Sequence, residues 1–297
     1  MTLPNIAAIE AGGTKFVVSV CRGDRLGERI VIPTADPETT LSSAVDTVTR
    51  ELQGDSLAAV GIASFGPIDI DPTSTNFGTI GATPKQGWAG INLREYFQRA
   101  FNCPVGIESD VNGAALAEAG WDIGGPINHL AYVTVGTGIG VGIVHRGAIS
   151  NGASHPEIGH IRVPRHVEDA AFAGVCPFHG DCLEGLASGP AIFERWQTTL
   201  SDLDPHHLAH DIEAFYLGQL AANIALHHRP EVIIFGGGVS QTPGLIPRIR
   251  KECQSALGGY LPDLDSSDAI TSLIQPPRLG TDSGIRGAYM LGKALLN

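Results

Sequence analysis

The 297-residue chain has no long hydrophobic run, no recognisable export signal and no excess of basic residues. No apolar run approaches the ~20 residues that a membrane-spanning helix needs. The opening Met1-Thr2-Leu3-Pro4-Asn5 has no basic segment followed by an apolar one. Both absences favour a cytoplasmic protein without a membrane partner. The 19 Lys and Arg face 31 Asp and Glu, a net charge of -12, which argues against nucleic-acid binding because such binding needs a basic face.

Cysteine is scarce, and the phosphate-binding Walker A pattern is missing. The odd count of five cysteines, without an export pattern, argues against a framework of disulfides. No GxxxxGK[ST] stretch occurs, so a P-loop nucleotide site is excluded. The 43% hydrophobic content and the length fit a globular protein with room for two ordinary domains.

Two glycine-threonine loops occur in matching settings, each between two apolar, β-branched runs. The first is Gly12-Gly13-Thr14-Lys15 and the second is Gly136-Thr137-Gly138. Glycine at a strand-to-strand turn lets backbone N–H groups approach a phosphate closely. An ordinary hairpin turn is the alternative for the first loop. Because glycines weaken strand interiors, their recurrence at every second position from Gly136 to Gly142 favours a ligand. Together the loops predict polyphosphate binding by a duplicated fold.

The hydrophobic periodicity alternates between strands and helices, which predicts an α/β protein. We expect strands at 6–20 (a hairpin), 29–32, 57–63, 105–108, 130–144 (a hairpin) and 232–235. We expect helices at 41–53, capped by Thr39 or Thr40, and at 93–101, 111–119, 211–228, 247–257 and 283–296, the last capped by Ser283.

Asp110 stands between a predicted strand and a predicted helix. Open α/β sheets place their ligand chemistry at the carboxyl ends of strands. A carboxylate there can accept the proton of a hydroxyl that attacks a phosphoryl group. A simple helix N-cap is the competing interpretation of Asp110, because Asp favours that position.

The sequence Cys176-Pro177-Phe178-His179-Gly180-Asp181-Cys182 has metal-ligand spacing, and His160 precedes it by sixteen positions. Two thiolates and two imidazoles form a closed set suited to structural Zn²⁺, and the sulfurs disfavour Mg²⁺ or Ca²⁺. His155 and His166 are alternatives for the distant ligand. The other interpretation is a set of unrelated histidines and buried thiols. A metal would explain how the irregular segment 151–185 stays folded.

Two acidic residues and a glycine run could each bind a ligand or have a purely structural role. Glu157 and Glu184 flank the metal motif, where they suit sugar hydroxyls or are solvated acids. Gly236-Gly237-Gly238 follows an apolar strand, where it suits an adenosine or forms a plain turn.

The order of these motifs resembles the ROK family of sugar kinases and repressors. The similarity runs from Ile6 to the closing Ser283-Gly284-Ile285-Arg286-Gly287-Ala288 helix. It includes both loops, Asp110, Glu157-Ile158-Gly159-His160 and the cysteine motif. The branch that it resembles most is bacterial fructokinase, on the evidence of Glu10-Ala11-Gly12-Gly13-Thr14-Lys15, of His179, and of the run from Cys182 to Pro190.

The resemblance implies an actin-like ATPase (ribonuclease H-like) fold, in which two α/β domains enclose an ATP and sugar cleft. We expect one domain at 1–112 plus about 284–297, and the other at 113–283 with the zinc-binding segment 151–185. The implied activity is ATP-dependent phosphorylation of D-fructose at its 6-hydroxyl, with Mg²⁺ accompanying ATP and structural Zn²⁺ in a homodimer. Another hexose (mannose, glucose, allose or an N-acetylhexosamine) is the alternative substrate. A DNA-binding regulator of the same family is disfavoured, because no room precedes the first strand for a helix-turn-helix.

The family's functional residues carry over to matching positions of this chain. By similarity Asp110 is the catalytic base. The phosphate-binding residues are Gly12, Gly13, Thr14, Lys15, Gly136, Thr137 and Gly138, with Pro190, Gly236, Gly237 and Gly238 near the nucleoside. The sugar-binding residues are Thr83, Ser109, Asp110, Glu157, His160 and Glu184, and the zinc ligands are His160, Cys176, His179 and Cys182.

Three positions depart from the common family pattern. Glu10 replaces an Asp, Ser109 replaces an Asn before the catalytic Asp, and His179 replaces a thiolate of the metal motif. The first two changes resemble the fructokinase branch and are interpreted as substrate tuning, and the third preserves the number of metal ligands.

Overall fold

The computed structural model describes residues 4–83, 85–120 and 125–296. Contacts divide the chain into two compact units. The first comprises Met1–Trp121, Ile149–His155 and Thr281–Asn297, and the second comprises Asp122–Ala148 and Pro156–Gly280. The border therefore differs from the expected 112/113. Helix α3 (Asp110–Gly120) stays with the first unit because it packs against α9 (Ser283–Lys293).

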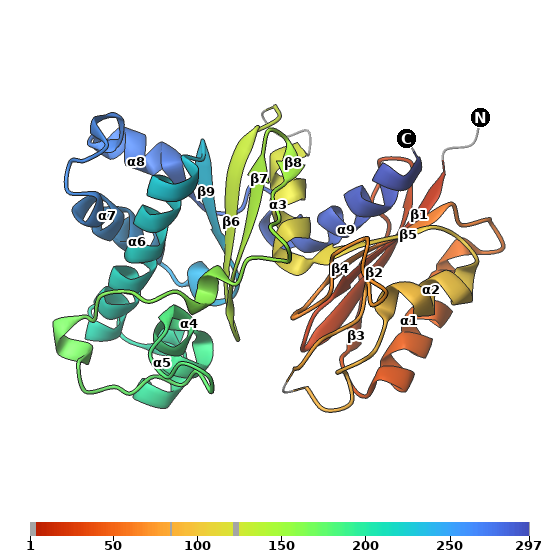
Figure 1. Ribbon diagram of the computed structural model, residues 1–297, viewed down its shortest axis with the longest axis horizontal. Helices are drawn as coiled ribbons and strands as arrows, with labels where there is room; N and C mark the ends of the chain where they lie inside the picture. The colour runs from red at the N-terminus through yellow and green to blue at the C-terminus, as the bar shows by residue number, and fades with distance from the viewer. Residues whose placement is uncertain (1–3, 84, 121–124, 297) are drawn as a thin grey trace. The chain divides into compact units, whose positions relative to one another are not determined.

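The first unit is built on a five-stranded mixed sheet of order β3-β2-β1-β4-β5 (Figure 1). Its strands are β1 (Asn5–Ala11), β2 (Lys15–Arg22), β3 (Ile30–Pro33), β4 (Ala59–Ser64) and β5 (Val105–Ser109). The strands β1, β4 and β5 are parallel, whereas β2 pairs antiparallel with both β1 and β3. Ala11, Ser64 and Ser109 share one register line, so the turn after β1 and the start of α3 lie at the same edge.

Helices cover both faces of this sheet. The helices α1 (Pro37–Leu52) and α2 (Leu93–Phe101) pack on one face around the fully buried Trp88 and Phe97. The other face packs against α9 through Ile285, Ala288 and Tyr289 (Figure 1). The approach is close, because a Cβ on Gly61 of β4 would lie 1.8 Å from the carbonyl oxygen of Ala288.

Two predicted helix caps were wrong. Helix α1 begins at Pro37, because Asp36 accepts a hydrogen bond from the N–H of Thr39 at 2.9 Å and so caps the helix earlier than the apolar spacing indicated. Ser283 is the first residue of α9 instead of its cap, and its hydroxyl donates to Glu118 Oε1 at 2.7 Å.

The second unit repeats the strand order of the first. Its sheet has the order β8-β7-β6-β9-β10, which matches β3-β2-β1-β4-β5 position by position. The strands are β6 (His129–Val135), β7 (Ile139–His145), β8 (Ala148–Ile149), β9 (Val232–Gly236) and β10 (Ile274–Gln275). The pair β6–β7 is antiparallel, like β1–β2. The pair β6–β9 is parallel, like β1–β4. The predicted duplication is therefore confirmed at the level of topology.

The helices of the second unit enclose one large hydrophobic core. They are α4 (Leu183–Ala187), α5 (Gly189–Trp196), α6 (Leu208–His228), α7 (Leu245–Leu257) and α8 (Ser267–Leu273). The helices α4, α5 and α8 were not predicted from the sequence, because they are too short for a clear periodicity. Short 3₁₀ turns complete the chain: η1 (Ile158–His160), η2 (Val167–Asp169), η3 (Leu200–Asp202), η4 (Val239–Gln241), η5 (Pro262–Leu264), η6 (Gly280–Asp282) and η7 (Ala294–Leu296).

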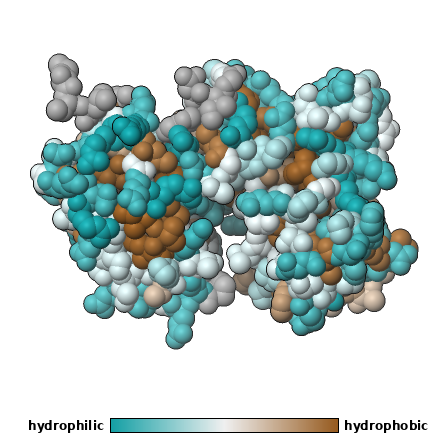
Figure 2. Space-filling model, turned by 180° about the vertical axis from the view of Figure 1, so that it is seen from behind, coloured by the Kyte–Doolittle hydropathy of each residue, from teal (hydrophilic) through white to brown (hydrophobic). Residues whose placement is uncertain are grey.

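Among the described residues, every helix is too short or too polar to cross a bilayer. The face drawn in Figure 2 is mostly hydrophilic, with smaller apolar areas between. The most exposed large apolar side chains include Val167, Phe178 and Tyr260, at 80%, 82% and 78% exposure.

Candidate active site and metal centre

The first glycine loop is the tight turn between β1 and β2. The N–H of Gly12 donates to the carbonyl oxygen of Lys15 at 3.0 Å, and the hydroxyl of Thr34 donates to the carbonyl oxygen of Gly12 at 2.8 Å. Gly13, Thr14 and Lys15 are exposed. A Cβ on Gly13 would meet no atom within 4 Å, so its backbone faces open space. The turn therefore has the open geometry that an anion-binding loop requires.

Glu10 is the last residue but one of β1, and its carboxyl group is largely buried. Burial, with a smaller contribution from Asp110, raises the pKa of Glu10 to about 7, although Arg29 and Lys15 oppose the shift. A Cβ on Gly284 of α9 would lie 2.5 Å from the carboxyl carbon of Glu10. Glu10 is therefore enclosed by α9 and influenced by the carboxylate of Asp110.

Asp110 is the first residue of α3, directly after β5. Its Oδ1 accepts a hydrogen bond from the N–H of Val111 at 2.8 Å, and the side chain is partly exposed. The parallel strand β4 separates β5 from β1, so Asp110 and the turn at Gly12 lie about two strand spacings apart, ~10 Å, at one edge. A substrate hydroxyl and a phosphate held at this edge would lie within reach of the Asp110 carboxylate.

A buried polar cluster lies beside Asp110. Glu108, only 8% exposed, accepts hydrogen bonds from the N–H of Ser109 at 3.0 Å, from Asn112 Nδ2 at 2.7 Å and from Asn151 Nδ2 at 2.7 Å. Asn112 Nδ2 also donates to Asn151 Oδ1 at 2.9 Å. Burial raises the pKa of Glu108, although these hydrogen bonds oppose the shift. The cluster fastens the segment Ile149–His155 to β5 and α3, which no local sequence signal indicated.

The segment around Thr83 contributes to the first unit near the glycine loop. The hydroxyl of Thr83 accepts a hydrogen bond from the N–H of Lys85 at 3.3 Å, and Lys85 Nζ donates to the carbonyl oxygen of Gly13. Trp88, close to this segment in the sequence, is fully buried and donates from Nε1 to the carbonyl oxygen of Ala35 at 2.9 Å. Pro84 lies outside the described residues. A separate hollow of about 840 Å³ in this unit involves none of the predicted site residues among its lining.

The second glycine loop is the turn between β6 and β7. The N–H of Gly136 donates to the carbonyl oxygen of Gly138 at 2.9 Å, and Thr137 is exposed. Glu184 Oε2 accepts from the N–H of Ile139 at 2.9 Å. A Cβ on Gly138 would lie 2.7 Å from the same oxygen. Glycine is therefore needed here because the Glu184 carboxylate packs directly against the turn.

Glu184 also contacts the metal-ligand cluster. Its Oε1 lies 3.8 Å from His160 Nε2. The pKa of the nearby Glu157 is raised, mainly because the carboxyl group is desolvated by burial. The charge of Glu184 adds to this shift, whereas His160 opposes it. From their positions in the sequence, both carboxylates are predicted to bind sugar hydroxyls. The structure adds a second role for Glu184, which links the second glycine loop to His160.

Two of the three glycines that were expected near the nucleoside have packing reasons of their own. A Cβ on Gly236 would lie 2.1 Å from the hydroxyl oxygen of Tyr132. Gly237 has a φ of +84° and lies against the backbone of Val135. A Cβ on Gly238 would meet no atom within 4 Å. Pro190 is exposed in the first turn of α5, whose cap is Ser188.

Four predicted metal ligands come together in the second unit. One ligand atom from each of His160, Cys176, His179 and Cys182 lies within 4.8 Å of the others. His160 Nδ1 lies 3.4 Å from Cys182 Sγ and 3.7 Å from Cys176 Sγ, and His179 Nδ1 lies 3.6 Å from Cys176 Sγ. A tetrahedral Zn²⁺ with usual bond lengths separates N and S ligands by about 3.6 Å. The cluster fits that ion.

The two alternative histidines lie elsewhere. His155 Nδ1 lies 3.3 Å from Ser109 Oγ in the first unit. His166 Nδ1 accepts from the N–H of Glu168 at 3.2 Å, and its ring packs edge-on against Phe215. His160 is therefore the fourth member of the cluster because its backbone turn η1 packs against β7, where a Cβ on Gly159 would lie 1.9 Å from the carbonyl oxygen of Ile139.

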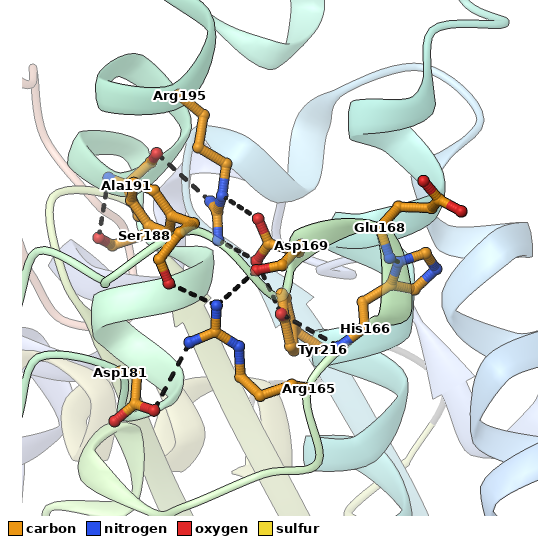
Figure 3. Close-up of polar contacts among 10 residues, drawn as sticks. Arg165, His166, Glu168, Asp169, Asp181, Ser188, Ala191, Arg195 and Tyr216 are labelled. Carbon is orange, nitrogen blue, oxygen red and sulfur yellow. Dashed lines mark hydrogen bonds and ion pairs between the residues drawn. The ribbon is translucent and has the colours of Figure 1, made fainter.

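A buried ionic network anchors the irregular segment that carries the cluster (Figure 3). Asp169 binds Arg195 with both carboxylate oxygens, at 2.8 and 2.7 Å, and accepts from the hydroxyl of Tyr216 at 2.7 Å. Figure 3 shows Arg165 between Asp169 and Asp181, and Arg165 lies 3.5 Å from Asp181. Since Asp181 lies between two cysteines of the motif, the network connects the metal-ligand cluster to α5 and α6. No spacing rule predicted it.

Comparison with known proteins gives a consistent result over the whole chain. The model of the "ROK family" matches residues 6–294. A Bacillus subtilis relative is 41% identical over 98% of this chain and 96% of its own. The Zymomonas mobilis fructokinase is 40% identical over 97% of this chain and 96% of its own.

A solved structure supports the same assignment. The ROK hexokinase of Thermus thermophilus aligns with a TM-score of 0.78 and 25% identity, over 98% of this chain and 99% of its own. The two α/β units thus have the actin-like ATPase fold that the resemblance implied. The chain belongs to the ROK family of sugar kinases and regulators.

Proposed function

We propose that this protein is an ATP-dependent fructokinase that phosphorylates D-fructose at the 6-hydroxyl. The observation that carries this proposal is the near-complete match, at 37–41% identity, to proteins named fructokinase from Zymomonas mobilis and Pediococcus pentosaceus and to the Bacillus subtilis relative. The site supports the activity, because one edge of the first sheet carries both an open glycine turn and a partly exposed aspartate.

In this proposal Asp110 accepts the proton of the fructose 6-hydroxyl as that oxygen attacks the terminal phosphorus of ATP. The N–H groups of the turns at Gly12–Thr14 and Gly136–Gly138 donate to phosphate oxygens. Lys15, exposed at the first turn, adds a positive charge. Mg²⁺ bound with ATP would neutralise phosphate charge, and the carboxylates of Glu10 and Asp110 are oxygen ligands of the kind it accepts.

The metal-ligand cluster is proposed to hold structural Zn²⁺. His160, Cys176, His179 and Cys182 would fill all four tetrahedral positions, so the ion would have no open site for chemistry. Burial raises the pKa of the Cys182 thiol to about 11 in the metal-free chain, so metal binding must displace a proton. Through His160 and Glu184, the ion would hold the second glycine loop in place.

The decisive test is the variant Asp110→Asn, assayed by coupled release of ADP with fructose. A general base contributes typically 10²–10⁴-fold, so kcat should fall by about that factor while the KM for fructose changes little. The same assay across fructose, mannose, glucose, allose and N-acetylhexosamines tests the substrate. Near-normal turnover of Asp110→Asn would remove Asp110 from the reaction, and a preference for glucose would overturn the assignment to fructose. The homodimer and the cytoplasmic location remain predictions.

A further inference from the structure

His155 contacts Ser109, the residue directly before Asp110, although it comes from a distant part of the sequence. It is the last residue of the segment Ile149–His155, which the contacts assign to the first unit. Its Nδ1 lies 3.3 Å from Ser109 Oγ. Ser109 directly precedes Asp110 and is only 2% exposed.

The hydroxyl of Ser109 contacts both the backbone of α3 and the ring of His155. Ser109 Oγ accepts from the backbone N–H of Asn112 at 3.3 Å. A hydroxyl group has one donor hydrogen and two acceptor lone pairs, so Ser109 can donate to His155 Nδ1 while its oxygen accepts from Asn112. The neutral imidazole then carries its proton on Nε2. Burial lowers the pKa of His155, which keeps the ring neutral.

The Nε2 atom of His155 is available to a ligand. Within the described part of the chain this atom has no hydrogen-bond partner, and it is not sealed off from solvent. The Ser109 side chain is buried, and its hydroxyl already has His155 and Asn112 as hydrogen-bond partners. Nε2 is therefore the free polar atom of a ring whose other nitrogen contacts the residue directly before Asp110.

The backbone that carries His155 is held rigidly against the same elements as Asp110. Asn151 donates to Glu108 at 2.7 Å and accepts from Asn112 at 2.9 Å. Glu108 belongs to β5 and Asn112 belongs to α3. The segment that carries His155 is therefore attached to the same strand and helix that position Asp110. A donor fixed in this way costs little further ordering when a ligand binds.

We propose that His155 binds the sugar directly and contributes to its selection. Its Nε2–H donates to a second hydroxyl of the fructose whose 6-hydroxyl faces Asp110, and Ser109 is the positioning residue that orients the ring. The inference rests on the proposed fructokinase activity. In this proposal His155, which Ser109 holds, contacts the sugar in place of Ser109.

Two variants separate a sugar contact from a structural role. In His155→Gln the side-chain amide occupies the position of Nε2 and keeps the distal donor. In His155→Asn the amide occupies the position of Nδ1 and keeps only the bond to Ser109. We expect His155→Asn to raise the KM for fructose by about 3- to 10-fold, the effect of one lost neutral hydrogen bond. We expect His155→Gln to stay within about twofold of the unmodified protein, and kcat to change less than KM in both.

Further measurements complete the experiment. The exposed His206→Gln is the matched control, and melting temperatures verify that every variant folds. The effect of Ser109→Ala on KM should disappear in a His155→Ala background, since Ser109 acts through His155. The ratio of kcat/KM for fructose over glucose should fall in His155→Asn.

The outcomes are distinct. Three results would overturn the inference and leave the kinase assignment intact. They are a KM for fructose that stays normal in His155→Asn but rises in His155→Gln, a KM that rises equally in both variants, and a KM that is unchanged in both. An unmodified protein that phosphorylates no hexose of the panel would overturn the proposed function instead.

Discussion

Replacing Glu10 by Gln is expected to stabilise the protein more at alkaline than at acidic pH. The pKa of Glu10 rises from 4.5 to about 7 on folding, mainly through burial. Because the folded-state value is the higher one, the folded protein holds a proton that the unfolded chain has lost between those two pH values. The free energy of unfolding therefore falls as pH rises from 4.5 to 7, by about 3 kcal/mol in total, and is unaffected above that range. Gln is neutral at every pH and avoids this loss.

The measurement is urea unfolding of Glu10→Gln and of the unmodified protein at pH 5.5 and pH 8.5. The stability gain of the variant should be larger at pH 8.5 by roughly 2 kcal/mol, since most of the titration lies between the two conditions. Other titrating groups are common to both proteins and cancel in the comparison. Glu28→Gln, at an exposed acid, reports the effect of simply removing a surface charge.

The contribution of Asp110 to this shift can be separated from burial. Asp110 is the second cause of the raised pKa of Glu10, so Asp110→Asn should narrow the pH range over which Glu10→Gln gains stability. An equal stability gain of Glu10→Gln at both pH values would refute the reasoning, because it would show that Glu10 ionises like a solvated acid.

Three further predictions follow from the packing and the metal-ligand cluster. Asp169→Asn should destabilise the protein by about 3–5 kcal/mol in urea unfolding, because Arg195 would be left buried and unpaired at 6% side-chain exposure; an effect below 1 kcal/mol would contradict this. Cys182→Ser, or treatment with a chelator, should remove Zn²⁺ from elemental analysis and lower the melting temperature, whereas a fully stable, zinc-free native protein would exclude the site. Gly61→Val should prevent α9 from docking, since even a Cβ would lie 1.8 Å from the Ala288 oxygen, and normal soluble expression with an unchanged melting temperature would refute this.

Much of the fold was predictable because its signals are local. The two hairpins, helix α2 with its exact bounds and the long helix α6 follow from periodicities that need only a few neighbouring residues. The short helices α4 and α5 escaped prediction because five to eight residues hold too few turns for a hydrophobic period. The expected border of the first unit differs from the observed one, since α3 is held in this unit mainly by packing against α9, more than 160 residues away in the sequence.

The candidate site divides in the same way. Its chemical groups can be identified from the residues alone: two glycine turns, an aspartate after a strand, and a set of soft metal ligands whose spacing suits zinc. The three-dimensional packing shows which of His155, His160 and His166 joins the cysteines. It also shows that Glu184 bridges the second glycine turn and His160, and that His155 lies beside Ser109. This difference arises because spacing fixes which residues share a turn, whereas contacts such as Ile139 to Glu184, 45 positions apart, depend on how whole elements pack.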